Sequence, residues 1–191
     1  MKMNETATQL MDAAQGLVQS RGYNAFSYKD LAASVGIRTA SIHYHFPAKA
    51  DLGVALMQRY LGGLDETLGK IDRAKITSRA KLKRFIKLYS ETEACGAICL
   101  CGSLASDYET LTPELREAVG EYLTRSEQWV TKVIDQGIAD GEFDFAGKPA
   151  DAATSLLSSL QGALILSRAK SGTTSSLNAV QRVFMETIGA A

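Results

Sequence analysis

The chain has 191 residues, of which 46 % are apolar and 22 % charged, and these proportions exclude a disordered protein. Its 21 basic and 21 acidic residues cancel, which excludes a protein that coats nucleic acid through a large positive charge. Residues 1–60 nevertheless hold six Lys or Arg against four Asp or Glu, a net charge of +2. This mildly positive N-terminal part suits a few phosphate contacts per subunit.

Apolar residues recur at helical spacing through most of the chain, and no alternating run indicates a sheet. We therefore predict an all-α fold of about nine helices. No apolar run approaches the ~20 residues that a membrane span needs. The N-terminus also lacks the apolar segment of a signal peptide, so we expect a cytoplasmic protein with no membrane contact, whose three cysteines are free thiols.

Near the N-terminus, cap signals predict two short helices joined by a tight turn, after a longer helix over residues 4–21. Ser27, with Asp30 three residues later, forms the capping-box pattern of a helix start. Gly36 stands where a left-handed residue would end that helix. Thr39 is expected to cap the next helix.

That next helix, over residues 40–45, has only Ile42 and Phe46 as clear core positions. Its outward side carries small residues, hydroxyls and an aromatic ring, which suits the major groove of DNA because bulk at the front would block approach. The outward residues are Thr39, Ala40, Ser41, His43 and Tyr44.

The run Ile42–Leu52 reads IHYHFPAKADL, and it follows the pairs Gly22-Tyr23, Phe26-Ser27, Leu31-Ala32 and Gly36-Ile37. With these residues the stretch resembles the DNA-binding helix-turn-helix of the TetR family of repressors. The resemblance covers roughly residues 5–65. The family often has Ser where Arg38 stands, Gly where Ala40 stands and Tyr where His43 stands. These departures bear on which bases are read.

We expect Arg38, Thr39, Ala40, Ser41 and His43 to face base edges. Arg38 could bind a guanine, and Ala40 could lie against a thymine methyl group. The expected DNA-binding set is completed by Ser27, Tyr28, Tyr44 and Lys49.

Phosphate contacts are expected from Tyr28, Tyr44 and Lys49. A cation such as Lys49 in the first turn of a helix opposes the helix dipole, and a bound phosphate would remove that penalty. His43 and His45 do not indicate a metal site, because residues two apart on a helix point to different faces and no third ligand stands nearby. No metal or cofactor is expected.

The rest of the chain is predicted to form a helical domain for effector binding and dimerisation over residues 51–191, behind a DNA-binding domain over residues 1–50. The last two helices are rich in apolar and small residues, so they could pair with their copies in a homodimer. The helices are expected over residues 48–68, from residue 78 onward, and over 112–140, 149–170 and 175–188, with a polar connector over 69–77.

Three cysteines, Cys95, Cys99 and Cys101, have a spacing that fits neither a zinc site nor a dithiol redox motif. The segment that starts at Cys99, Cys-Leu-Cys-Gly-Ser-Leu-Ala, resembles one found in a subset of TetR-like ligand domains, at the wall of the effector cavity. The thiols could be reactive sensors or simply small buried residues. The expected effector-binding set is Tyr89, Cys99, Cys101, Ser103 and Trp129.

Together these features predict a transcriptional regulator, a repressor that leaves a palindromic operator when a small molecule binds or a thiol is modified. One alternative is a Cys-dependent enzyme with a His base. It is disfavoured because both histidines lie in the helix-turn-helix, far along the chain from the cysteines. The other alternative is a helical adaptor that does not bind DNA, which leaves the pattern from Ser27 to Leu52 without a purpose.

Overall fold

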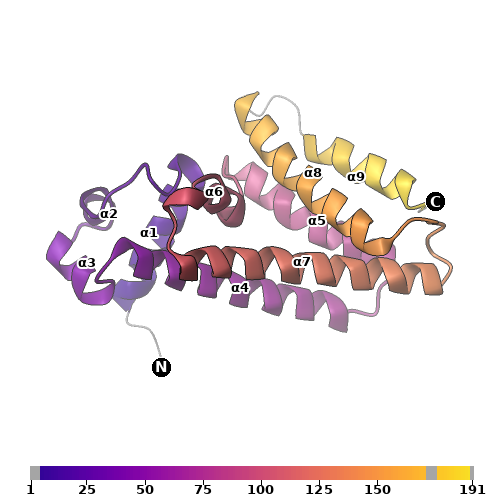
Figure 1. Cartoon of the computed structure of the whole chain (residues 1–191), viewed down its shortest axis with the longest axis horizontal. Coiled ribbons are helices and arrows are strands. Elements are labelled where there is room, and N and C mark those ends of the chain that lie inside the picture. The colour runs from indigo at the N-terminus through magenta and orange to yellow at the C-terminus, as the bar shows by residue number, and fades with distance from the viewer. Residues whose placement is uncertain (1–4, 171–175, 190–191) are drawn as a thin grey trace. The chain divides into compact units, whose positions relative to one another are not determined.

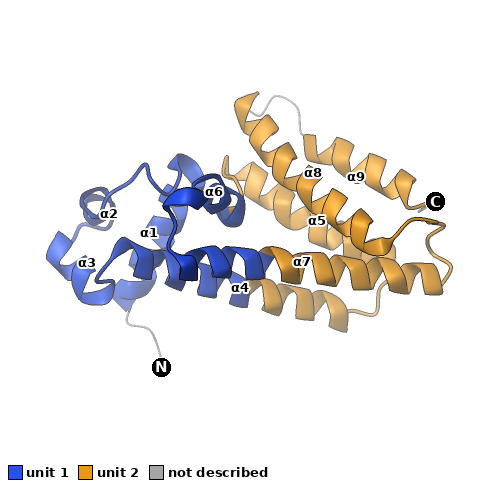
Figure 2. Cartoon of the chain, viewed as in Figure 1, with its two compact units in different colours: residues 1–62, 100–122 blue, residues 63–99, 123–191 orange. Residues whose placement is uncertain are grey.

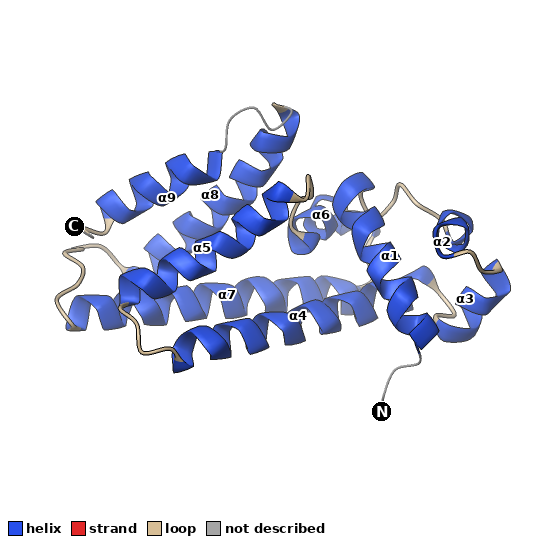
Figure 3. Cartoon of the chain, turned by 180° about the vertical axis from the view of Figure 1, so that it is seen from behind, coloured by secondary structure: helices blue, strands red, loops and turns tan. Residues whose placement is uncertain are grey.

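The computed structural model describes residues 5–170 and 176–189, and in these residues it contains helices and no strands (Figures 1 and 3). The predicted all-α fold is therefore confirmed. Within the same residues no helix combines the length and apolar character of a membrane span. The elements are α1 (Glu5–Arg21), α2 (Tyr28–Val35), α3 (Thr39–His45), α4 (Lys49–Arg73), α5 (Ser78–Ala94), α6 (Leu100–Ser106), the short 3₁₀ helix η1 (Tyr108–Thr110), α7 (Pro113–Ala139), α8 (Pro149–Ala169) and α9 (Ser176–Thr187).

The chain divides into two compact units, one of residues 1–62 with 100–122 and one of residues 63–99 with 123–191 (Figure 2). Helices α4 and α7 each contribute residues to both units. The functional boundary expected near residue 50 stays a prediction.

The first unit is built on α1, which contacts α2 and α6, while α2 also contacts α3. Leu10, Leu31, Ile42 and Leu52, from four successive helices, are completely buried. Burial of each side chain of this size contributes roughly 1.5–3 kcal/mol to the free energy of folding. The small core thus holds α2 and α3 against α1.

One predicted helix start is wrong by a residue. The third helix begins at Thr39, and Arg38 occupies the cap position without a side-chain hydrogen bond. The backbone N–H of Ser41 donates to the carbonyl of Arg38 at 2.9 Å, so the turn is already helical at Thr39. The hydroxyl of Thr39 is not needed to start it.

The connector predicted over residues 69–77 is wrong in its first half, because α4 continues to Arg73. The sequence pattern indicated a helix break at Gly69. Ile71 is only 5 % exposed, however, and its burial favours the continuation of the helix for about one and a half further turns. The chain leaves the helix only at residues 74–77, where the hydroxyl of Thr77 accepts from Ala80 N and caps α5.

In the second unit α8 contacts both α5 and α9, and α5 also contacts α9. A helix as apolar as α8 must be covered on more than one side, and these two neighbours provide part of the cover. Phe85 of α5 packs against Trp129 at 5.5 Å and against Tyr89 at 5.8 Å between ring centroids. Aromatic packing of this kind forms one centre of the core.

Near the end of α7, Gly137 lies directly under the ring of Phe143, and a side-chain carbon at this position would overlap that ring. Gly120, on the same helix, has open space at the corresponding point. The two glycines therefore differ in the reason for lacking a side chain.

We expect Gly137→Ala to lower the free energy of unfolding by about 1–3 kcal/mol, because the ring of Phe143 must shift to admit the methyl group. Gly120→Ala is the matched control, expected to be neutral or to stabilise by up to ~1 kcal/mol through its higher helix propensity. Urea denaturation of both variants measures the difference. Equal midpoints would show that the Phe143 ring moves at no cost.

Candidate nucleic-acid interface

Local hydrogen bonds define α2 at both ends, as predicted. The hydroxyl of Ser27 accepts from Asp30 N at 3.3 Å, and the Asp30 carboxylate accepts from Ser27 N at 2.7 Å, which completes the capping box. Hydrogen bonds from Ser27 hold the pKa of the Asp30 carboxyl below its ordinary value. Gly36 ends the helix with φ of 75°, in the left-handed region. The turn into α3 is thereby fixed.

The exposed side of α3 is the one predicted to read DNA. Ile42 is completely buried and Phe46 is 7 % exposed, whereas Tyr44 is 85 % exposed. At about 100° per residue, Ala40 and Tyr44 lie on the side opposite these two anchors. Thr39 is half-buried, and the exposed residues here are Arg38, Ala40, Ser41, His43 and Tyr44.

A recess of about 570 Å³ lies beside α3. It brings part of the predicted set together with Thr6, from the first turn of α1, and with His45. Sequence reasoning did not select Thr6, because a position more than 30 residues upstream carries no local signal of this proximity. The lining residues are Thr6, Ile37, Arg38, Ala40, Ser41, Tyr44 and His45.

Lys49, at the start of α4, points back toward the turn between α1 and α2. Its ammonium donates to the carbonyls of Tyr23 and Phe26, both at 2.5 Å, and lies 4.1 Å from the centroid of the Phe26 ring. Burial lowers the pKa of Lys49, and the charges of Asp107 and Asp30 oppose this shift. An ammonium has three N–H donors, so one remains for a phosphate oxygen. The expected phosphate contact of Lys49 stays a prediction.

The same turn is held from another direction by Asp107, which follows α6. Its carboxylate accepts from the backbone N–H groups of Tyr23 at 3.0 Å and Asn24 at 3.3 Å. The side-chain amide of Asn24 donates to the hydroxyl of Thr110 at 2.9 Å. A cation thus satisfies the carbonyls of the turn and an anion satisfies its amides. Sequence reasoning missed Asp107, whose partners lie more than 80 residues away.

Tyr28 and His43 both form hydrogen bonds with the turn between α3 and α4, His43 with the carbonyl of Pro47. The Tyr28 hydroxyl lies 2.9 Å from the carbonyl oxygen of Phe46 and 2.7 Å from that of Ala48. Its single O–H is shared by these acceptors, so a phosphate would have to compete for it. Burial, with smaller effects of Asp51 and Tyr23, raises the pKa of Tyr28 far above its ordinary value, which keeps the hydroxyl a donor.

The residues expected at the effector cavity divide between the two units. Tyr89 and Trp129 both pack on Phe85 in the second unit, and the Trp129 indole N–H donates to Asp72 at 3.1 Å. In the first unit the Ser103 hydroxyl donates to the carbonyl of Val18 at 2.8 Å. These hydrogen bonds give Trp129 and Ser103 clear structural tasks. Their contact with an effector stays a prediction.

The cysteines differ in exposure. Cys99 is 3 % exposed and Cys101 is completely buried, with its thiol 3.5 Å from the carbonyl oxygen of Val119, whereas Cys95 is exposed. A reagent from solvent would reach Cys95 first. In the part of the chain that the structure describes, no three His, Cys, Asp or Glu side chains group as a metal site would require.

A short helix with an exposed face, fixed by a capped turn and backed by a small core, defines a helix-turn-helix regulatory protein. Comparison with family models identifies the family. Residues 10–56 match the model described as bacterial regulatory proteins, tetR family, and residues 79–183 match the tetracyclin repressor-like C-terminal domain. The chain belongs to the TetR family of bacterial transcriptional regulators.

Individual relatives agree with this assignment. A curated relative, the HTH-type transcriptional repressor KstR2 of Rhodococcus jostii, is 26 % identical over 141 residues, which are 71 % of this chain and 67 % of that protein. A TetR-family regulator from Agrobacterium tumefaciens has a TM-score of 0.90 at 30 % identity, covering 96 % of this chain and 97 % of its own. A TetR regulator from Legionella pneumophila has a TM-score of 0.88 at 29 % identity, covering 98 % and 100 %.

We expect Lys49→Met to lower the free energy of unfolding by about 1–3 kcal/mol, because two carbonyls lose a charged donor while the apolar stem is kept. Lys29→Met, at an exposed position of α2, is the matched control and should change it by less than ~0.5 kcal/mol. Urea denaturation followed by circular dichroism measures both. A Lys49 variant as stable as the control would contradict the structural role of the ammonium.

Proposed function

We propose that this TetR-family regulator is a repressor that binds a palindromic DNA operator as a homodimer and is released by a small-molecule effector. The observation that carries the proposal is the exposed face of α3, held in place by buried Ile42 and Phe46. Small residues there leave room for the edges of base pairs, and a helix of this size fits the major groove.

In this proposal base edges are contacted from α3 and from the residue before it. Arg38 offers a bidentate donor pair for guanine, and Ala40 a methyl group for thymine. The full base-facing set is Arg38, Thr39, Ala40, Ser41 and His43.

Phosphates would be held at the flanks of the same surface. Tyr44 is the most exposed aromatic residue of this surface, and its hydroxyl could donate to a phosphate oxygen while its ring packs edge-on against His45. Lys49 offers its third N–H, and Ser27 and Tyr28 lie at the start of α2, where backbone N–H groups favour an anion. Contacts of this kind set the register of the protein on DNA and carry little sequence information.

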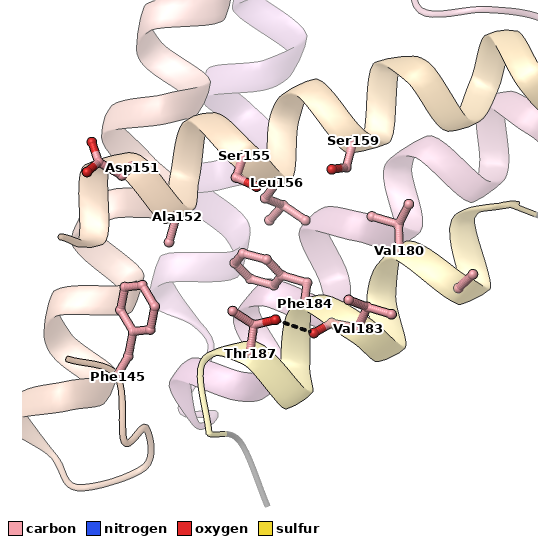
Figure 4. A pocket seen from close by; sticks show the side chains of 11 residues that line it. Phe145, Asp151, Ala152, Ser155, Leu156, Ser159, Val180, Val183, Phe184 and Thr187 are labelled. Atoms are coloured by element: carbon pink, nitrogen blue, oxygen red, sulfur yellow. Dashed lines mark hydrogen bonds between the residues drawn. The ribbon is translucent and has the colours of Figure 1, made fainter. Parts of the chain in front are cut away.

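The second copy is proposed to bind on α8 and α9. Ile165, Leu166 and Val183 are 50 %, 53 % and 57 % exposed, which is unusual for large apolar side chains that belong to neighbouring helices. A groove of about 510 Å³ also lies between the two helices, with Leu156 on one wall and Phe184 on the other (Figure 4). A two-fold axis through these helices would bury the apolar groups of both copies.

Such a dimer would present two copies of α3 to one operator, about 34–36 Å apart or a multiple of that spacing. The effector is proposed to bind in the C-terminal helical region and to change the tilt of α4, and with it the spacing of the reading helices. By linkage, the effector and DNA then weaken each other's binding by the same factor.

A small molecule is the preferred trigger over thiol modification, because Cys99 and Cys101 are both buried. This proposal also includes two expectations from the sequence. The effector is expected to contact Tyr89, Cys99, Cys101, Ser103 and Trp129, and the ligand domain is expected to belong to the subset of the family that shares the Cys99 segment. A Cys-dependent enzyme and an adaptor are the weaker alternatives, because the family consists of regulatory proteins.

We expect the wild-type protein to retard a duplex from the region upstream of its own gene in a band-shift assay at moderate salt. Arg38→Ala should weaken the complex about 5- to 150-fold, because a bidentate base contact is worth about 1–3 kcal/mol. Arg84→Ala, at an exposed position of α5, is the control and should leave binding unchanged. Absence of a retarded band with wild type, or equal binding by Arg38→Ala, would refute the DNA-binding surface.

We expect the wild-type protein to sediment at about twice the chain mass of 20.5 kDa. Leu166→Asp combined with Val183→Asp should sediment as a monomer, because two buried carboxylates in each copy would lack partners. Lys83→Asp, on the exposed face of α5, is a control that should remain dimeric. A wild-type monomer at micromolar concentration would remove the proposed interface.

A further inference from the structure

The imidazole of His43 has one nitrogen whose role is fixed by its neighbour. Nδ1 lies 3.1 Å from the carbonyl oxygen of Pro47. A carbonyl oxygen can only accept a hydrogen bond, so Nδ1 must carry the hydrogen. In a neutral imidazole the other nitrogen, Nε2, then has a lone pair and no hydrogen.

The ring is also held in position. The Tyr28 ring packs against it edge-on, with 4.9 Å between centroids and an interplanar angle of 66°. The Tyr28 hydroxyl binds the carbonyls of Phe46 and Ala48, the residues on either side of Pro47. The Pro47 carbonyl is therefore anchored on both sides, and the side chain that bonds to it is oriented before DNA arrives.

Nε2 has a restricted choice of partners. His43 is exposed on α3, beside the highly exposed Tyr44. A bare acceptor cannot bind a phosphate oxygen, guanine O6 or N7, or thymine O4, because all of these are acceptors too. In the major groove the available donors are the amino groups of cytosine N4 and adenine N6.

We propose that His43 is a specificity-determining residue whose Nε2 accepts a hydrogen bond from an exocyclic amino group of cytosine or adenine in the major groove. This inference rests on the proposed function. The family often has Tyr at this position, and a phenol can donate as well as accept. The neutral imidazole, whose Nδ1–H donates to the Pro47 carbonyl, can only accept a hydrogen bond from DNA. It therefore discriminates between bases, whereas a hydroxyl would tolerate several.

The first test concerns the tautomer alone and needs no DNA. Nitrogen-15 NMR of the full-length protein at about pH 8, where an ordinary imidazole is neutral, distinguishes a protonated from an unprotonated ring nitrogen. We expect His43 Nδ1 to give the signal of a protonated nitrogen and Nε2 that of an unprotonated one. The opposite assignment would overturn the inference.

The second test is selection of bound duplexes from a random DNA library. Wild type is expected to enrich one base pair at a position of each half-site that depends on His43. Each base pair contains one cytosine or adenine, and its amino group is the proposed donor. His43→Phe, which keeps a ring but has no acceptor, should lose the preference at that position and keep the others. Arg84→Ala, at the exposed position of α5 used above, is the control and should keep all preferences.

The third test changes the DNA and uses the wild-type protein, so it does not depend on a variant that folds. At the selected position, adenine is replaced by purine or cytosine by 2-pyrimidinone, which removes only the amino group. We expect the wild-type affinity to fall about three- to tenfold, the effect of one lost hydrogen bond. His43→Phe should bind the altered and unaltered DNA equally.

Three outcomes of the DNA experiments would also contradict the inference, and they are distinguishable. If wild type selects no motif at all, the proposed function fails together with the role of His43. If it selects a motif and its affinity is unchanged when the amino group is removed at the position that depends on His43, only the amino-group contact fails. An equal loss for wild type and His43→Phe on the altered DNA would likewise overturn that contact and leave DNA binding intact.

Discussion

The position of α2 beside α1 depends on the six-residue turn over residues 22–27, which is held by two opposite charges. In this turn the amides of Tyr23 and Asn24 and the carbonyls of Tyr23 and Phe26 lie outside the hydrogen bonds of the helices, and they would otherwise depend on water. The ammonium of Lys49 satisfies two carbonyls of the turn, and the carboxylate of Asp107 satisfies two amides. Charge-assisted hydrogen bonds are shorter and stronger than neutral ones, so the turn is fixed more firmly than a surface loop.

The parts of the site that sequence reasoning predicted correctly are those with local causes. The capping box at Ser27 and the left-handed Gly36 involve residues three or four apart, and both are present. The α3 start was misplaced by one residue, since the backbone alone begins that turn. The extension of α4 past Gly69 was missed, because the burial of Ile71 depends on packing that a local pattern does not contain.

The parts of the site that sequence reasoning missed depend on contacts between residues far apart in the chain. A lysine at the start of a helix, next to an expected DNA-binding surface, indicates a phosphate ligand. The sequence around Lys49 contains no sign that its ammonium donates to the carbonyls of Tyr23 and Phe26. Asp107 is harder still to recognise, because its position after α6 has no motif of its own. Both residues acquire their roles only when the chain has folded back on itself.

The anchoring of the N-terminal turn by a residue that comes after α6 has a consequence for modular engineering. The helix-turn-helix segment of this regulator does not contain all the residues that hold it. Asp107 and Thr110, whose side chains form hydrogen bonds with the turn between α1 and α2, come far later in the sequence. A chimera that transplants only the first 50 or so residues onto a related ligand domain would inherit whatever side chains the recipient carries there. Compatibility between donor and recipient at these two positions, more than the junction itself, would decide whether such a hybrid reads its new operator.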